Sequence, residues 1–302
     1  MIAIAVSYAA LLIFLAGLVW RVIRWAWAPV PFRIPTVCGQ QKSLPWIKSS
    51  WLESPHRAVG VVARMALEVL TYRSLLRNVR SRQEPGPRLI YRGAPWLWLA
   101  ALAFHWSLLI VLLRHLRLFV QPAPRLAVLL TRLDGCLQIG APTIYVSDAV
   151  ILWALLYLLF RRLGDAQVRY ISLPADYFAL FLLLTIVTTG ICMRYFARTD
   201  IVAVKQFAIG LATFAPIVPQ TLGVWFYVHL SLVSVLAAYL PFSKLMHMGG
   251  VFLSPTRNLA NNNRIKRHVN PWNYPVKVHL YEEWEDEFRA KMEAAGLPVE
   301  KR

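Results

Sequence analysis

The chain has 302 residues, of which 58% are hydrophobic and 16% are charged, and its mean hydropathy is +0.49. This balance excludes an ordinary soluble domain and indicates an integral membrane protein. The net charge of +18 does not require a nucleic-acid partner, because basic residues of membrane proteins collect in the segments that stay on the cytoplasmic side. We therefore expect contacts with membrane lipid and none with nucleic acid.

Five apolar segments approach the roughly 20 residues that an α-helix needs to cross about 30 Å of hydrocarbon. They are Ile2 to Trp20, Trp96 to Leu116, Ser147 to Phe160, Pro174 to Tyr195 and Leu222 to Met246. The third is the shortest, and Asp148 lies at its start. No basic residue precedes the first segment, so we interpret it as a membrane anchor and not as a signal peptide.

Arginine and lysine collect between the first and second spans and after the last one. By the positive-inside rule these segments are cytoplasmic, which places the N-terminus outside and the C-terminus in the cytoplasm. The predicted organisation is a first transmembrane helix (1–27), a basic cytoplasmic loop (28–94), a four-helix membrane core (95–248) and a cytoplasmic tail (249–302). The expected fold is an all-α bundle of five transmembrane helices.

Four histidines lie within the second and fifth spans: His105, His115, His229 and His247. The two spans run antiparallel and a helix rises 1.5 Å per residue, so His115 reaches the outer level of His229, and His105 the inner level of His247. Imidazole is a common axial ligand of haem iron. The pattern therefore predicts two haems b, each bound by one histidine from each span. A haem-free proton-coupled transporter, with the histidines as a relay, is one alternative.

The spacings of the histidines on the two spans differ, which this hypothesis has to accommodate. Along continuous helices the histidines of the fifth span would be about 27 Å apart and those of the second about 15 Å apart. Helix tilt must absorb the difference of about 12 Å, which haem tolerates better than a zinc-sized ion with ligands about 2 Å away.

The remaining histidines and the cysteines have no paired position. We expect His56, His268 and His279 to be ordinary polar residues. The three cysteines are too scattered for a cysteine-bound redox centre. Cys192 is interpreted as a small apolar residue, and a functional role for Cys38 stays open.

The stretches FHWSLLIVLLRH (104–115) and VHLSLVSVLAAYLPFSKLMHM (228–248) resemble the gamma subunit of respiratory nitrate reductase. The resemblance implies a five-helix dihaem cytochrome b with the same histidine spacings and cross-pairing. The loop FRIPTVCGQQKSLPWIKSSWLESP and the tail SPTRNLANNNRIKRHVNPWNYPVKVHLYEEWEDEF resemble the DsrM branch, the membrane cytochromes of sulfite-reduction-associated DsrMKJOP complexes. Haem b anchors of nitrate reductase, formate dehydrogenase or hydrogenase type are alternatives without this loop and tail.

The DsrM resemblance implies several partners. In the cytoplasm it implies a DsrK-like iron–sulfur subunit related to heterodisulfide reductase, and further subunits would be DsrJ-, DsrO- and DsrP-like, including a multihaem cytochrome c. Electrons would pass between menaquinone or another quinone near the outer haem and the iron–sulfur subunit, in either direction. We thus expect an electron-transfer subunit with no catalytic side chain of its own.

The quinone site implied by the family lies near the outer haem, where Arg114, Tyr145 and Asp148 are candidate contacts to quinone or to a haem propionate. Asp148 could instead cap its helix. The lysine that nitrate reductase relatives carry just before the third helix is missing here.

Two further helices are predicted outside the spans. Residues Val59 to Leu76 show periodic apolar positions, typical of an amphipathic helix on the membrane surface or on a partner, with a solvated linker as the alternative. Residues Tyr281 to Met292 form an acidic and aromatic helix that has too few apolar residues for a core of its own, and we expect it to dock on a partner subunit.

Overall fold

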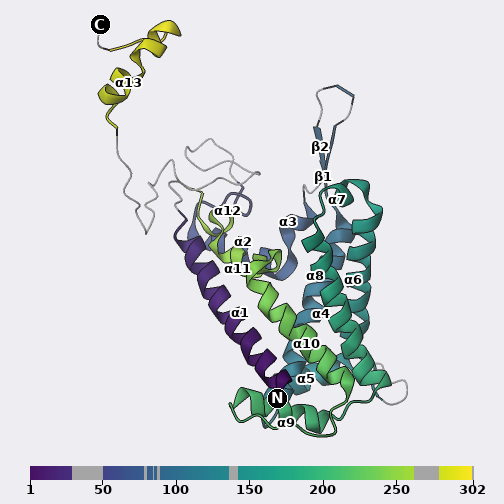
Figure 1. Cartoon of the computed structure of the whole chain (residues 1–302). Helices are drawn as coiled ribbons and strands as arrows, with labels where there is room; N and C mark the ends of the chain where they lie inside the picture. The colour runs from purple at the N-terminus through teal and green to yellow at the C-terminus, as the bar shows by residue number, and fades with distance from the viewer. Residues whose placement is uncertain are drawn as a thin grey trace.

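The computed structural model describes residues 1–28, 50–77, 80–83, 85–86, 89–135, 142–261 and 279–300. Within these ranges the chain is helical apart from one short hairpin (Figure 1). The predicted all-α fold class is confirmed, and the hairpin, in which β1 (Arg80–Gln83) pairs antiparallel with β2 (Leu89–Arg92), is a small addition that the sequence did not predict. Gly86, between the strands, has a φ of 92°, a conformation that glycine adopts without steric cost.

Four helices in the described part of the chain are long and apolar enough to cross a membrane. They are α1 (Ile2–Ala26), α4 (Pro95–Phe119), α8 (Pro174–Ile191), which continues through a π-helical turn to Phe196, and α10 (Val224–Tyr239), which continues through a 3-10 turn to Phe242. They coincide with the first, second, fourth and fifth predicted spans. The chain is therefore a multi-pass membrane protein.

The third predicted span corresponds to α6 (Val146–Gly164), which is less apolar than the other four. It has 19 residues, but Asp148 lies in its first turn and Arg161 and Arg162 lie in its last. It nevertheless stands beside α4 and α8 in the bundle (Figure 1), and its buried Ile151, Ala154 and Leu155 pack in one cluster with Phe104 of α4 and Leu183 of α8.

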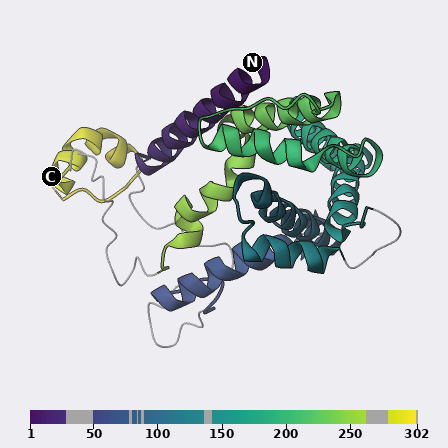
Figure 2. The same ribbon diagram turned by 90° about the horizontal axis from the view of Figure 1, so that it is seen from below.

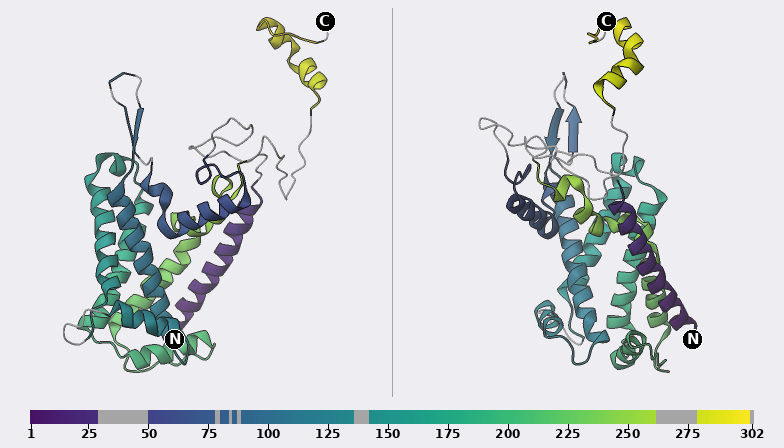
Figure 3. Two further views of the ribbon diagram at one scale, coloured as in Figure 1. Left: turned by 180° about the vertical axis from the view of Figure 1, so that it is seen from behind. Right: turned by 90° about the vertical axis from the view of Figure 1, so that its left-hand side faces the viewer.

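The connecting elements gather at the two ends of the bundle. The chain's N-terminus lies at one end with α5 (Arg125–Asp134) and α9 (Ile201–Ala212), as the view from below shows (Figure 2). The other end carries the hairpin and the remaining helices (Figure 3), which are α2 (Ala58–Thr71), α3 (Arg73–Leu76), α7 (Ala166–Tyr170), α11 (His247–Leu253), α12 (Pro255–Asn258) and α13 (Tyr281–Ala294). Thus α2 and α3 occupy the predicted 59–76 segment, and α13 the predicted tail helix.

The sequence analysis did not anticipate α5 or α9. Apolar residues of α9, Val204 and Phe207, pack against Ile4 of α1 and Phe226 of α10 in one buried cluster, so α9 closes the end of the bundle beside the N-terminus. Asp200 caps this helix by accepting the backbone N–H groups of residues 203 and 202, and these hydrogen bonds hold the pKa of its carboxyl below the usual value.

The fifth span is not one continuous helix, as its prediction over Leu222 to Met246 had assumed. The α-helix α10 ends at Tyr239, two 3-10 turns follow, and α11 begins at His247. Pro241, in the first of these turns, lacks a backbone N–H and its ring clashes with the preceding helical turn, so the α-helix cannot pass through it. The separation of about 27 Å was expected for a straight helix, which this span is not.

The same 3-10 turn is in close contact with α1. A Cβ added at Gly17 would lie 2.8 Å from Cβ of Pro241 and 2.9 Å from Cζ of Phe242. Because real Cβ atoms do not approach so closely, this contact between α1 and the interrupted span needs a glycine.

Replacing Gly17 with leucine should therefore push α1 away from Pro241. We expect Gly17→Leu to lower the free energy of unfolding by about 1–3 kcal/mol, the usual effect of overpacking. The measurement is thermal unfolding of the detergent-purified protein. Ala16→Leu, at the neighbouring exposed position, is the matched control, and equal melting temperatures of the two variants would contradict the contact.

Candidate functional site

The four intramembrane histidines come from two elements. His105 and His115 both lie on α4, whereas His229 lies on α10 and His247 is the first residue of α11. The side chains meet across the bundle in two pairs. At the end that carries α2 and α11, the rings of His105 and His247 have centroids 5.9 Å apart and planes at 88°. We call these residues the inner pair.

The outer pair, His115 and His229, lies toward the end that carries α5 and α9. These two side chains are close enough to interact electrostatically. The structure thus places the rings of His105 and His247 side by side, and His115 within electrostatic range of His229.

Three of the four imidazoles have their Nδ1 atom hydrogen-bonded to a backbone carbonyl. The distances are 2.7 Å from His105 to the oxygen of residue 101, 2.7 Å from His115 to that of residue 111, and 2.8 Å from His247 to that of residue 244. A carbonyl oxygen only accepts, so Nδ1 must carry the proton. In the neutral ring, Nε2 is then the atom with a free lone pair, as a metal-ligating histidine requires.

In His229 the Nδ1 atom is hydrogen-bonded to a side chain and not to a backbone carbonyl. Its Nδ1 lies 2.9 Å from the hydroxyl of Thr189, and that hydroxyl lies 2.9 Å from the carbonyl oxygens of both Thr185 and Ile186. Because the single hydroxyl hydrogen points to a carbonyl, the Thr189 oxygen accepts from Nδ1–H of His229. With Nδ1–H bonded in this way, each of the four imidazoles has the lone pair on Nε2 when the ring is neutral.

The inner pair has a spacing that suits a shared metal centre. An imidazole nitrogen lies about 2 Å from the transition metal that it ligates, so the centroids of two rings on opposite sides of one iron stand about 6 Å apart. The 5.9 Å between His105 and His247 agrees with this value. The donor set, two neutral imidazoles per level in an apolar bundle, fits bis-histidine haem.

A buried polar cluster lies next to the outer pair, on the turn of α4 that carries His115. Arg114 contacts Asp148 at 2.7 Å and Asp134 at 3.2 Å, and all three side chains are largely buried. Ser147 donates its backbone N–H and its hydroxyl to Asp134. Arg114 is therefore ion-paired with both carboxylates of the cluster, as expected for a buried guanidinium.

The second half of this cluster is built around an aromatic ring. The guanidinium carbons of Arg114 and Arg194 each lie 3.9 Å from the ring centroid of Tyr145, in cation–π contact. Tyr195 donates its hydroxyl to Asp148 and accepts the backbone N–H of Tyr145. The Nε atoms of both arginines are buried and have no hydrogen-bond partner among the described residues. These two donors fit an anion such as a haem propionate.

The structure brings Arg114, Tyr145 and Asp148 together, as expected for neighbours of the outer histidines. The sequence analysis missed four further members, namely Asp134, Ser147, Arg194 and Tyr195. A buried arginine that needs counter-charges was a usable signal for an acidic partner, but the sequence could not indicate that α5 would supply it.

The other predicted polar histidines lie outside the two pairs. His279 is 3.8 Å from Glu283 at the start of α13, and His56 precedes α2. His268 and Cys38 lie outside the described residues. Cys192 is partly buried at the π-helical turn of α8.

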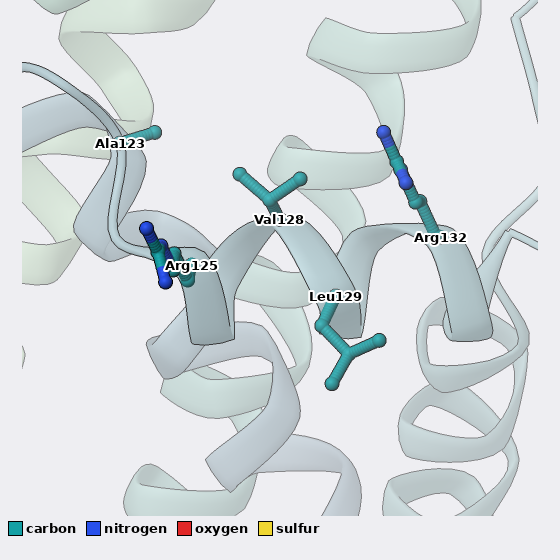
Figure 4. Close-up of a pocket in the computed structure, with 5 residues that line it drawn as sticks. All are labelled: Ala123, Arg125, Val128, Leu129 and Arg132. Carbon is teal, nitrogen blue, oxygen red and sulfur yellow. The ribbon is translucent and has the colours of Figure 1, made fainter.

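A shallow pocket of about 220 Å³ lies on α5 (Figure 4), lined by Ala123, Arg125, Val128, Leu129 and Arg132. It includes neither a histidine of the pairs nor a member of the buried polar cluster, so we assign it no part in the site.

Comparison with known proteins identifies the family of the chain. Residues 89–268, which include both histidine pairs, match the family described as nitrate reductase gamma subunit. The chain belongs to this family. It is also 45% identical over 284 residues to the Hdr-like menaquinol oxidoreductase cytochrome b-like subunit of Archaeoglobus fulgidus, covering 92% of this chain and 84% of the relative. The subunit of the same description from Archaeoglobus profundus is 40% identical over 275 residues, covering 89% of this chain and 81% of the relative.

Within this family member, Arg114 should be essential to the stability of the outer end. Arg114→Met leaves Asp134 and Asp148 without their shared counter-charge, and removing one partner of a buried ion pair costs about 3–5 kcal/mol. We expect a lower melting temperature in detergent. Arg117→Met, on the same helix and only partly buried, is the control that should change little. If both variants melted at the wild-type temperature, the cluster would not stabilise the fold.

Proposed function

We propose that this chain is a dihaem b membrane subunit that transfers electrons between a membrane quinone and an iron–sulfur partner in the cytoplasm. The observation that carries the proposal is the placement of four imidazoles in two pairs, each with Nδ1 hydrogen-bonded within the fold so that Nε2 is left for a ligand. Membership of the nitrate reductase gamma subunit family supports it.

We further propose that α6 is the fifth span and that the N-terminus lies on the outer side. Charge placement supports α6, because Asp148 is neutralised by Arg114 within the bundle, while Arg161 and Arg162 lie at the end where side chains reach the interface. The basic loop and tail, at the end with the inner pair, would then face the cytoplasm.

The proposed ligands are His115 and His229 for the outer haem b, and His105 and His247 for the inner one. Bound haem supplies the one-electron redox chemistry. The protein holds each imidazole by its Nδ1 hydrogen bond, so that ring orientation is set before the ligand arrives. The two levels of the bundle then define a route for electrons from the outer to the inner end.

We propose that Arg114, Tyr145 and Asp148 contact the outer haem propionate or the quinone. The unpartnered Nε donors of Arg114 and Arg194 support an anion or a carbonyl oxygen at this position. Asp148 is committed to Arg114 and Tyr195, so its role would be to keep these donors in place.

The partners that we propose follow from the relatives. Their description as subunits of an Hdr-like menaquinol oxidoreductase supports menaquinone as the quinone and a subunit related to heterodisulfide reductase as the soluble partner. More specifically, we propose that the soluble partner is a DsrK-like iron–sulfur protein. DsrJ-, DsrO- and DsrP-like subunits would complete the complex, which would act in dissimilatory sulfur metabolism. The helix α13, with Tyr281 and Trp284 exposed, is the segment that we propose docks on it.

Haem content tests the proposal directly. The detergent-purified chain should contain two haems b per polypeptide by pyridine haemochrome assay, and a menaquinol analogue should reduce them. His115→Ala should retain one haem, because it loses a ligand of the outer pair alone. The control His279→Ala should keep both.

A well-folded wild-type protein without haem would overturn the proposal. So would a His115→Ala variant that retained two haems of unchanged spectrum.

A further inference from the structure

The turn between α2 and α3 reaches the inner histidine pair. Tyr72, the residue between these helices, has its ring centroid 4.8 Å from that of His105, with the planes tilted by 40°. His105 is thus enclosed by Tyr72, His247 and, edge-on at 5.0 Å, Phe104. Tyr72 belongs to the loop between two spans, so its contact with a residue in the middle of α4 needs an explanation.

The C-terminus of α2 is attached to α4 well below the start of that helix. Trp98 donates its indole N–H to the carbonyl of Thr71 at 2.7 Å, and Trp106 donates to that of Leu70 at 3.1 Å. Trp106 follows the first residue of α4 by eleven positions, about 16 Å along the axis. The turn therefore lies against the side of α4 at this depth, and two indoles satisfy carbonyls that the end of α2 would otherwise leave unpaired.

The backbone of Tyr72 has a left-handed conformation, with φ of 49° and ψ of 43°. Such a conformation is unfavourable for a residue with a side chain, and it persists where the surroundings enforce it. Here Glu68 bonds to the backbone N–H of Ser74 at 3.2 Å and to Arg257 of α12 at 2.8 Å, while the Ser74 hydroxyl contacts both side chains. Contacts from α2 and α12 therefore fix the turn. Residue 72 is a tyrosine, although glycine would adopt this backbone conformation without strain.

We propose that Tyr72 is a positioning residue for the inner haem. Its ring fixes the rotation of the His105 imidazole and keeps water away from the inner centre. This inference rests on the proposed function, since it concerns the haem bound by His105 and His247. Through Tyr72, the loop before the second span influences the midpoint potential and the g values of the inner haem.

The test compares ring removal with ring retention by redox titration and electron paramagnetic resonance of the two-haem protein. Tyr72→Gly removes the ring and suits the left-handed backbone, and Tyr72→Asn, which also tolerates this conformation, is the second variant in case glycine unfolds the turn. Both should keep two haems. In both, the midpoint potential of the inner haem should fall, because water stabilises the charged ferric form, and its low-spin g values should shift. Tyr72→Phe should resemble the wild type.

Phe214→Gly is the matched control. Phe214 is also an aromatic residue with positive φ, 57°, but it stacks on Tyr8 at the end with α9. Its variant should leave the inner haem unchanged. Wild-type potentials and g values in the ring-free Tyr72 variants would overturn the inference, as would a Tyr72→Phe variant shifted as much as Tyr72→Gly. A wild-type chain without haem would instead overturn the proposed function, so the two failures are distinct.

Discussion

The hydrogen bond at Nδ1 of each intramembrane histidine is the interaction on which the rest of the site depends. Within hydrocarbon an imidazole N–H needs an acceptor, and each helix supplies one, from a carbonyl of the preceding turn or, for His229, from the hydroxyl of Thr189. Once Nδ1–H is satisfied in this way, Nε2 is the nitrogen that can act on something else. The arrangement of α4 and the interrupted fifth span then places His105 beside His247 and His115 within electrostatic range of His229, at two levels of one bundle.

Two departures from regular helix lie beside the inner histidine pair. The break at Pro241 allows α11 to start with His247 beside His105, although the two histidines on the fifth span are farther apart in sequence than those on α4. The turn at Tyr72 lies against α4 because Trp98 and Trp106 donate to the carbonyls of Thr71 and Leu70 just before it. In both places the departure from regular helix is compensated by specific contacts, as a low-dielectric surrounding requires.

Hydrophobic length predicts the spans because crossing the bilayer is a local requirement, and α1, α4, α8 and α10 follow the predicted segments closely. The helices at 58–71 and 281–294 were likewise predicted from the local pattern of residues. The hairpin, α5 and α9 were not, because each depends on turn geometry or on packing against distant residues. The end of α10 at Tyr239 was missed although Pro241 is a local signal for it. The candidate site shows the same division. The four histidines are visible in sequence because they interrupt apolar runs, whereas Asp134, Arg194 and Tyr72 acquire their significance only through contacts between segments far apart in the chain.

The central claim is that each haem joins one histidine of α4 to one of the fifth span. The most direct measurement is a potentiometric titration of the haem spectrum in four single variants, each with one of the paired histidines replaced by alanine. The account predicts that the variants of His115 and His229 lose one and the same titrating component, and that those of His105 and His247 lose the other. Loss of a shared component by His105 and His115, or by His229 and His247, would contradict the pairing.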